Sequence, residues 1–584
     1  MKQLDPILVS VIANRFDAIC REIGETMYRT SRSPIFSEAR DFVTAVYDRK
    51  GRMIAQKPYI AVLAGAVPYA MRKIIEYFGD DLHPGDVILN NDPYLGGNNH
   101  QPDFTVAKPV FRDGVLSFWT IAKGHHADTG GGTGCCGYNP NATSIWEEGL
   151  RIPPVKIYEK GEYKKSIWDL ILANVRMQFL VEGDLRCQVG AATVGERKLV
   201  ELVGKYGIDT IEAAVDEILD GTERQMRQEI SDIPDGVYES VRYYDHDGIN
   251  RDKKVTIKLA IRIKGSDITF DYTGSDPQTM GGVSNTEANT FSSTCLALFN
   301  TVDPDIRKND GALRPIKLIA PPGSVVNCSE PAPCTSCTIC GTATIVEAVW
   351  LALSKAVPHL TQAGWARWSS PATMGFNPRT GRMFGDIHFL CKGGAGGTLG
   401  YDGWDHLGVI SCSGGLRAPD PELHELVDPY YLTSYEFLQD SAGPGKWRGG
   451  MGVKYFFRVE ADNILSDNFG DGLLPDTAPF GLAGGKGAKP NKLVVRRTDG
   501  TVEDPEVHKF VTLNTGDVYE VWETGGGGYG DPFERPIEKV QDDVLDELIS
   551  IDSAKNDYGV VIDPKTLTVN AKETEKLRKA HQKQ

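Results

Sequence analysis

Residues 255–264 read VTIKLAIRIK, and their pattern decides the fold class. Apolar side chains alternate with polar or small ones at a period of two, which is the pattern of a strand that buries one face. The apolar set is Val255, Ile257, Leu259, Ile261 and Ile263. Residues 238–244 and 268–272 also read as strands, so we expect a small antiparallel sheet.

Helical patterns flank this sheet along the sequence. Residues 1–30 carry apolar side chains at the spacing of an amphipathic helix, and most of 164–232 also reads as helix before the stop Pro234-Asp235-Gly236. Two further helices are expected at 65–78 and, buried, at 342–357. Short strands are expected at 41–48, 86–90 and 115–123. Between the last two we expect a loop rich in Gly, Asn and Pro.

The chain as a whole reads as an α+β protein of several domains. Its 584 residues and 64.0 kDa exceed one ordinary domain. From about residue 385 to 535 the sequence is rich in glycine and in strand patterns, so strands should dominate the C-terminal half. We expect an N-terminal domain (1–235), a small antiparallel sheet (236–330), a Gly-rich region (331–535) and a charged helix with a tail (536–584).

Charge and apolar runs exclude two classes of partner. The formal net charge is −16 and the isoelectric point is about 5.3, so the surface has no general attraction for nucleic acid or anionic lipid. The best candidate for a membrane span, residues 59–71, has 13 residues, well short of the roughly 20 that cross a bilayer. Asp5, Arg15 and Asp17 interrupt any signal peptide. Eleven cysteines do not suggest a disulfide framework, so we expect a reduced, cytoplasmic protein.

Two nearby stretches concentrate groups that can bind a metal ion. They read NNDPYLGGNNHQPDF (90–104) and KGHHADTGGG (123–132). Together they contain His100, His125, His126, Asp92, Asp103 and Asp128. A histidine and a carboxylate three residues apart can converge on one cation, and a histidine at the end of a neighbouring strand would add a third ligand. Because side chains alternate along a strand, only one of the two adjacent histidines should be that ligand, while the other orients substrate or packs.

The alternative is that these are ordinary polar residues that form turns and caps. Similar alternatives hold for Glu147, Glu148 and Arg151, which either line a site or pair on the surface, and the structural interpretation is favoured. Cys334, Cys337 and Cys340 form a C-x₂-C-x₂-C run without the fourth cysteine of a ferredoxin motif, which favours a structural or substrate-adjacent role over a cluster.

The glycine-rich stretches do not form a nucleotide site. GLAGGKGA at 481–488 and GPGKWRGG at 443–450 lack the spacing, the Ser or Thr and the following helix of a phosphate-binding loop. Gly525–Gly528 is interpreted as a turn that lets backbones approach closely. We therefore expect that this chain does not itself bind ATP.

Five stretches carry a resemblance to a known family. They are RDF at 40–42, the two histidine-containing segments, NATSIWEEGLRIPPVKI at 141–157 and GGGGYGDP at 525–532. From about residue 4 to 535 the chain resembles the hydantoinase B family. That family includes the B-type half of 5-oxoprolinase, N-methylhydantoinases, caprolactamase and the corresponding subunits of acetone and acetophenone carboxylases.

The resemblance implies a site for a divalent metal ion, Zn²⁺ or Mn²⁺. Its ligands would be Asp41, His100, Asp103 and His126, while His125 or Asp128 would serve as general acid or base. Independently of the resemblance, we expect Asp92, Glu148 and Cys337 next to the substrate. ATP and Mg²⁺ would be bound by a separate A-type partner subunit, in an (αβ)₂ hetero-oligomer. The three cysteines at 334–340 depart from the residue types usual in the family.

The resemblance also implies the reaction class. The first expectation is ATP-dependent hydrolysis of a lactam or cyclic imide, such as a hydantoin, 5-oxoproline or caprolactam. The alternative is ATP-dependent carboxylation of a ketone with bicarbonate, because both branches share these motifs. A third interpretation is a silent scaffold that only stabilises an ATPase partner.

Overall fold

The described residues between 4 and 232 form a seven-stranded antiparallel sheet covered by long helices. The computed structural model describes residues 4–132 and 134–582. The strands lie in the order β2-β1-β5-β4-β3-β6-β7. They are β1 (Phe42–Asp48), β2 (Met53–Pro58), β3 (Val87–Asn90), β4 (Asp103–Arg112), β5 (Val115–His125), β6 (Val155–Glu159) and β7 (Glu162–Tyr163).

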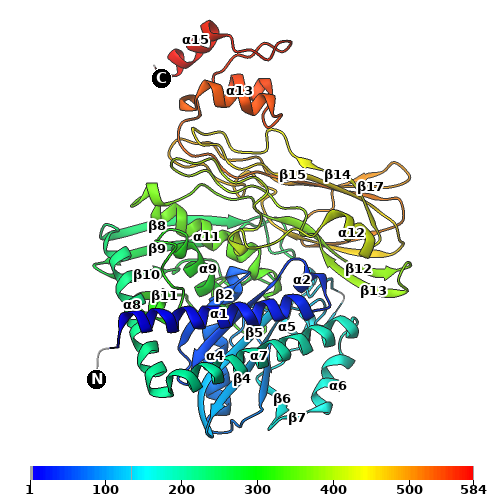
Figure 1. The fold of residues 1–584 in the computed structure, drawn as a ribbon. Coiled ribbons are helices and arrows are strands. Elements are labelled where there is room, and N and C mark those ends of the chain that lie inside the picture. The colour runs from blue at the N-terminus through cyan, green and yellow to red at the C-terminus, as the bar shows by residue number, and fades with distance from the viewer. Residues whose placement is uncertain (1–3, 133, 583–584) are drawn as a thin grey trace.

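Helices α1 (Pro6–Thr30) and α7 (Gln178–Tyr206) run side by side across one face of this sheet (Figure 1). The predicted amphipathic helix is confirmed, with Asp5 as its N-cap and Phe16 and Ile23 buried, although Ile7 at its start is exposed. The other helices of this part are α2 (Pro34–Ser37), α3 (Ala61–Ala64), α4 (Val67–Phe78), α5 (Ile145–Glu148), α6 (Lys165–Ala173) and α8 (Ile208–Ser231).

Strand β4 replaces the loop that the sequence led us to expect between residues 90 and 115. It pairs with β5 along its whole length and with β3 on its other side. Eight of its ten residues are buried, so the period of two that marks a half-exposed strand is missing, and Pro109 adds a second contrary signal. The expected loop is therefore wrong for residues 103–112.

The small antiparallel sheet predicted around residues 255–264 is confirmed for β8, β9 and β10, and a fourth strand that was not predicted, β11, pairs parallel to β10. Its order is β11-β10-β9-β8, and the apolar face of β9 is buried while Lys258 and Arg262 on the other face are exposed. Helix α11 packs against β8, β9 and α9. The elements are β8 (Gly236–Tyr244), β9 (Val255–Lys264), β10 (Asp267–Asp271), α9 (Glu287–Phe299), α10 (Asp310–Leu313), β11 (Ile316–Ile319) and α11 (Cys340–Leu353).

Helix α11 is the predicted buried helix. Together with the turn before it, it forms a stretch, Thr335–Leu353, that is long and apolar enough to cross a membrane, the one such stretch in the described part of the chain. Of its most apolar window, 83% is buried inside the protein, as in the core helix of a globular fold. This stretch is therefore weak evidence for a membrane span.

Two further sheets form the C-terminal half. Their orders are β13-β12-β16-β19 and β14-β15-β20-β17-β18. The strands are β12 (Ser369–Asn377), β13 (Arg382–Ile387), β14 (Tyr430–Phe437), β15 (Val453–Val459), β16 (Ile464–Gly470), β17 (Lys492–Arg496), β18 (Val502–Glu503), β19 (Lys509–Leu513) and β20 (Val518–Glu523). Helix α12 (Pro421–Val427) precedes β14. The predicted α+β fold with a strand-dominated C-terminal half is confirmed.

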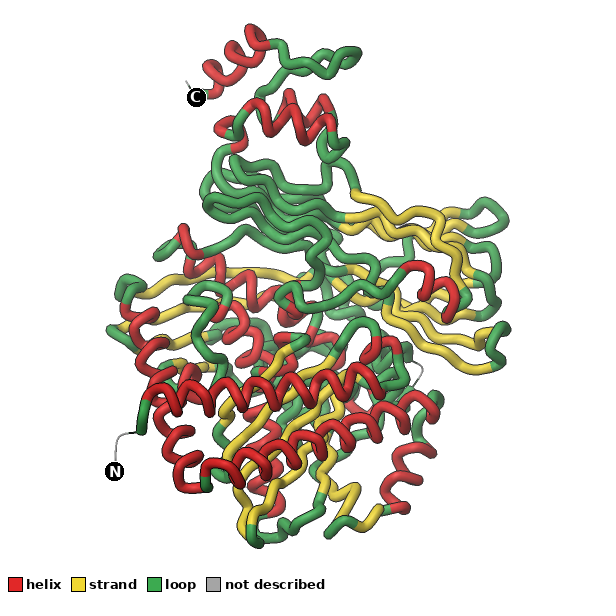
Figure 2. Tube along the Cα trace, in the orientation of Figure 1, coloured by secondary structure: helices red, strands yellow, loops and turns green. Residues whose placement is uncertain are grey.

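The glycine-rich stretches form a bundle of extended segments that lie side by side, seen as loops in Figure 2. A row of backbone hydrogen bonds crosses this bundle: Gly443 N–H donates to Gly526, Gly526 to Gly450 and Gly450 to Ala395, at 2.8–2.9 Å. A Cβ at Gly526 would overlap the carbonyl oxygen of Ala395. Close backbone approach is thus confirmed, but the segment around Gly526 joins several chain segments and does not form a simple turn.

We expect Gly526→Ala to lower the free energy of unfolding by about 3 kcal/mol, because the added methyl group forces two backbones apart. A matched control is Gly190→Ala on the exposed face of α7, where nothing lies within 4 Å of the new Cβ. That change should stabilise the helix by up to about 1 kcal/mol. Denaturant midpoints measure both, and equal midpoints for the two variants would contradict the role assigned to Gly526.

Residues 535–582 form three helices, α13 (Ile537–Leu545), α14 (Ile551–Asn556) and α15 (Ala571–His581), and α13 and α15 are labelled at the top of Figure 1. They have an apolar cluster of their own, which includes Val540, Tyr558 and Val560. This differs from the expected single helix with a tail. The domain boundaries proposed from the sequence stay a prediction.

Candidate metal centre

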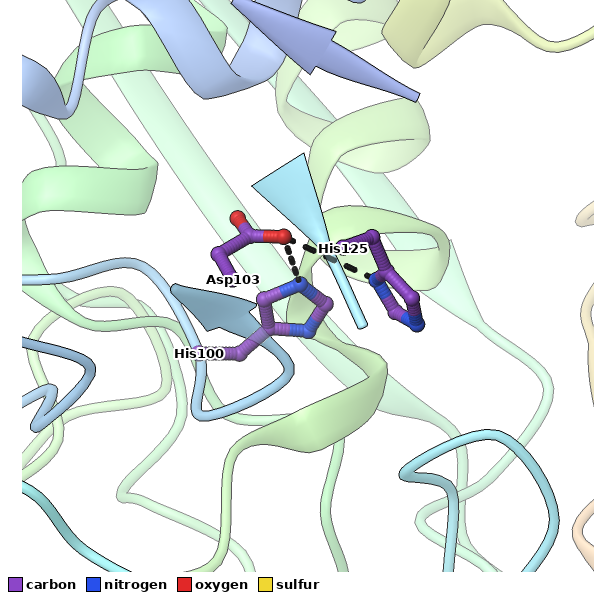
Figure 3. Close-up of side chains that lie close together, drawn as sticks. All are labelled: His100, Asp103 and His125. Atoms are coloured by element: carbon purple, nitrogen blue, oxygen red, sulfur yellow. Dashed lines mark ion pairs between the residues drawn. The ribbon is translucent and has the colours of Figure 1, made fainter. Parts of the chain in front are cut away.

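Asp103 and His125 face each other across the central strands. Asp103 begins β4, His125 ends β5, and the register pairs the two residues directly. His100 lies in the turn three residues before Asp103. In Figure 3 the three side chains point toward one another, with Asp103 Oδ1 3.1 Å from His100 Nε2 and 3.6 Å from His125 Nδ1. All three side chains are buried, and their ligand atoms lie within 4.8 Å of one another.

The outer nitrogen of each ring is held by a backbone carbonyl. His100 Nδ1 lies 2.7 Å from the carbonyl oxygen of Thr335, and His125 Nε2 lies 3.1 Å from that of Cys136. A carbonyl oxygen only accepts, so the protons sit on these nitrogens. The rings therefore point their other nitrogens, His100 Nε2 and His125 Nδ1, toward Asp103, as metal-binding histidines do when a carbonyl holds the far side of the ring.

Asp103 supplies the negative charge of the site. Neither of its oxygens has a hydrogen-bond partner of good geometry among the described residues. Burial opposes ionisation, but His100 and Lys123 outweigh it and hold the pKa of Asp103 well below its usual range. A cation placed between this buried carboxylate and the two ring nitrogens that face it would stabilise its negative charge.

Asp41, the residue before β1, reaches the same cavity but lies outside the group of three whose ligand atoms are close together. It lines a cavity of about 30 Å³ together with His100, Asp103 and His125. Burial raises the pKa of Asp41 to about 7, although His125 opposes this. The cavity has room for an ion or a water molecule, and is far smaller than the pockets of about 300 Å³ or more that hold small molecules. The donors present, two imidazoles and two carboxylates, fit a divalent metal ion.

His126 lies apart from this group, in contrast to the expectation from the family resemblance. Its ring stacks on Phe104 with centroids 4.2 Å apart, and its Nε2 lies 2.9 Å from Gln188 Oε1. Burial lowers the pKa of His126 to about 4, which keeps the ring neutral. The alternation of side chains along a strand predicted that only one of the two histidines is a ligand. The geometry places His125 with the other candidate ligands and His126 in the packing behind the sheet.

Lys123 was missed by the sequence analysis. Its buried Nζ is 3.6 Å from Asp103 Oδ2 and also donates to Asn99. Burial lowers the pKa of Lys123 to about 8, against the opposing effect of Asp103. The sequence did contain a pattern that identifies Lys123: residues two apart in a strand share a face, and Lys123 precedes His125 by two residues.

Asp92 and Asp128 stabilise loops outside the cavity. Asp92 Oδ2 accepts from Arg151 Nε at 2.9 Å, and its other oxygen accepts from backbone N–H groups of the following turn. Asp128 accepts from the N–H of Met177 at 3.0 Å and pairs with Arg176 at 3.1 Å. These contacts use both carboxylates for local structure, in line with the alternative of turns and caps.

Glu148 supports the site from one layer further out. Its two oxygens accept from the N–H groups of Cys334 and Thr335, each at 2.8 Å, and the carbonyl of Thr335 in turn holds His100. Burial raises the pKa of Glu148 to about 7, although these two hydrogen bonds favour the ionised form. Glu148 thus positions a candidate ligand through the intervening loop.

The three cysteines at 334–340 do not meet at one point, although Cys334 and Cys337 both approach the carbonyl oxygen of Asn99. Cys337 Sγ lies 3.5 Å from the carbonyl oxygen of Asn99, whereas Cys340 Sγ points away, 3.2 Å from that of Gly470. All described cysteines are free and buried, and none belongs to a group with metal-binding geometry in the described part of the chain. Their placement favours a structural role.

Comparison with known proteins places the whole chain in one family. The family described as "Hydantoinase B/oxoprolinase" matches residues 5–532. The chain is 36% identical over 571 residues to the beta subunit of caprolactamase from Pseudomonas jessenii, covering 96% of this chain and 97% of that protein. It is 32% identical to the B-type subunit of a putative D-/L-hydantoinase from Pseudomonas sp. (strain NS671), covering 99% of each.

Solved structures agree with this assignment. The crystal structure of the ATP-dependent caprolactamase from Pseudomonas jessenii superposes with a TM-score of 0.91 at 34% identity, covering 99% of this chain and all of that one. A nucleotide-free acetone carboxylase has a TM-score of 0.92 at 20% identity, covering 99% of this chain and 83% of the other, which shows a shared fold. The chain therefore belongs to the hydantoinase B/oxoprolinase family.

Proposed function

We propose that this chain is the metal-binding catalytic subunit of an ATP-dependent amidohydrolase that opens a lactam or cyclic imide. The observation that carries the proposal is the pair of imidazole nitrogens that face the carboxylate of Asp103 in a buried cavity, with the other nitrogen of each ring held by a backbone carbonyl. The similarity to a caprolactamase subunit along the whole chain supports the substrate class.

Asp41, His100, Asp103 and His125 would hold one divalent ion, and two nitrogen and two oxygen donors suit Zn²⁺ or Mn²⁺. When bound, such an ion supplies Lewis-acid polarisation of an amide carbonyl and lowers the pKa of water. His125 takes the ligand position that the family resemblance assigned to His126.

The remaining residues of the site balance the charge of Asp103 and limit the access of water to the cavity. Lys123 offsets the charge of Asp103 and, with its pKa lowered to about 8 mainly by burial, can hold or release a proton at Nζ near neutral pH. Lys123 replaces Asp128 as the candidate acid or base, because Lys123 contacts Asp103 whereas Asp128 is bonded to Met177 and Arg176. Tyr138, Trp368 and Phe389 line the cavity and keep bulk water out. A substrate ring needs this lining to move apart.

ATP and Mg²⁺ would be bound by an A-type partner subunit, in line with the naming of the caprolactamase and hydantoinase relatives as subunits. We expect the isolated chain to hydrolyse ATP at background rate only, because it lacks a phosphate-binding loop. A coupled phosphate-release assay on the chain alone and with its partner measures this. Robust turnover by the chain alone would overturn the division of labour. An (αβ)₂ assembly stays a prediction.

The reaction itself is tested on the complex with the A-type partner. With ATP and a panel of caprolactam, hydantoin and 5-oxoproline, we expect a ring-opened product by mass spectrometry. In parallel, labelled bicarbonate is supplied with acetone or acetophenone. Label in a new C–C bond, without ring opening, would replace the proposal with ketone carboxylation. Full ATP turnover by a complex whose B-type chain holds no metal would point to a scaffold.

A further inference from the structure

A second cluster of buried histidines and carboxylates lies in the C-terminal half, away from the candidate metal centre. Asp386 is on β13, His388 follows that strand, His424 is on α12 and Asp428 ends that helix. Asp386 Oδ2 is 3.5 Å from His424 Nδ1 and 3.9 Å from His388 Nε2. Asp428 Oδ2 is 3.8 Å from the same nitrogen of His424. The ligand atoms of Asp386, His388 and His424 lie within 4.8 Å of one another.

No lysine or arginine among the described residues lies within ion-pair distance of the carboxylates of this cluster, and Arg379 acts on Asp428 only from further away. Asp386 and Asp428 are each 5% exposed, and among residues 4–132 and 134–582 only the two histidines lie within ion-pair distance of them. Asp386 Oδ2 also has no hydrogen-bond partner there. Two buried carboxylates that share such surroundings cannot both ionise unless a cation joins them.

The histidines are in the state that metal binding requires. Burial lowers the pKa of His424 to about 4 and that of His388 further below its usual value, so both rings are neutral. The hydroxyl of Tyr455 lies 2.8 Å from His388 Nδ1 and 3.2 Å from His424 Nε2. It therefore ties the outer nitrogens of both rings together and turns the inner nitrogens toward Asp386. The hydroxyl of Thr373, 3.0 Å from His388 Nε2, would have to release that nitrogen.

The cluster also has an entry path. Asp386, His424 and Asp428 line a pocket of about 800 Å³ between the N-terminal and C-terminal halves of the chain, where Arg32 and Arg176 form part of the opposite wall. Asp386, His424 and Asp428 thus reach the pocket while His388 is buried away from it, which permits ion entry and an open coordination position on the pocket side.

We propose that Asp386, His388 and His424, with Asp428 beside them, bind a second divalent transition-metal ion that is independent of the candidate metal centre. Two imidazole nitrogens with one or two carboxylate oxygens form a donor set that Zn²⁺ accepts. The ion would connect β13 to α12 at the floor of the interdomain pocket.

The test is a count of bound Zn²⁺ on the full chain after dialysis against Zn²⁺ and removal of excess. We expect two equivalents for the wild type, one for His424→Ala, one for Asp103→Ala and none for the double variant, measured by elemental analysis. His359→Ala, which removes an exposed histidine outside both clusters, should keep two. The equivalent that each single variant retains reports that the chain is still folded.

A wild type with one equivalent that disappears in Asp103→Ala, while His424→Ala keeps it, would overturn the second site and leave the first intact. If His424→Ala loses one equivalent and Asp103→Ala loses none, the second site is supported and the candidate metal centre at Asp103 is refuted. If His424→Ala fails to fold, Asp386→Asn decides, because it keeps the size of the side chain: loss of one equivalent supports the second site, and no loss refutes it.

Discussion

Replacing Asp103 by alanine is expected to remove the ion of the candidate metal centre and to lower substrate turnover by more than about 100-fold, the upper range for residues that only support a ligand. Asp103 is the carboxylate that His100, His125 and Lys123 all face. Its loss leaves Lys123 as an unpaired buried cation, which costs about 3–5 kcal/mol of stability. Metal content, turnover of the complex and Tm measure the three effects.

Asp103→Asn separates chemistry from folding, because it keeps the shape of the side chain and removes its charge. It should also lose the ion. Asp113→Asn is the matched control: Asp113 lies in the turn between β4 and β5, and 85% of its side chain is exposed. Normal metal content and turnover in Asp103→Asn would show that no metal centre exists at this position.

The second large effect is a difference in metal content between variants of two adjacent histidines. His125→Ala should lose the ion and more than about 100-fold of turnover, because it removes the nitrogen that faces Asp103. His126→Ala should keep the ion and lose about 2–4 kcal/mol of stability, since it removes the ring stacked on Phe104 and leaves Gln188 without its partner. Elemental analysis and denaturant unfolding distinguish the two outcomes.

The pair of variants is its own control, because both remove the same side chain from neighbouring positions. Loss of the ion in His126→Ala and retention in His125→Ala would restore the ligand set implied by the family resemblance and would refute the geometry proposed for the site. Retention of the ion in both variants would show that the ion binds to residues other than these two histidines.

Helices and strands that bury one face were predictable from the sequence, because their apolar residues repeat at a regular period. The strand β9 and the helix α1 each bury one face, so their apolar residues repeat at 2 and at about 3.6 residues. Helix α11 was predictable from its continuous apolar run. Strand β4 was not, because burial on both faces removes the alternation on which such a prediction depends.

The candidate site was only partly predictable. His100, Asp103 and the neighbouring pair of histidines were found because they are close in the sequence. Lys123 was missed, although the alternation that separates His125 from His126 also places Lys123 beside His125. The second cluster was not predicted at all, because β13 and α12 contribute its members from positions about 40 residues apart and neither element has a motif.

By itself, the sequence determined the α+β class, the family and the segments in which ligands are to be found, because these depend on local periodicity and on ordered motifs. Only the tertiary structure decided which histidine faces Asp103, since the choice depends on the register between β4 and β5 and on the carbonyls of Thr335 and Cys136. The tertiary structure also decided the role of the glycines. Their lack of a side chain matters where separate segments meet, as at Gly526 and Ala395, and that meeting is a property of the folded chain alone.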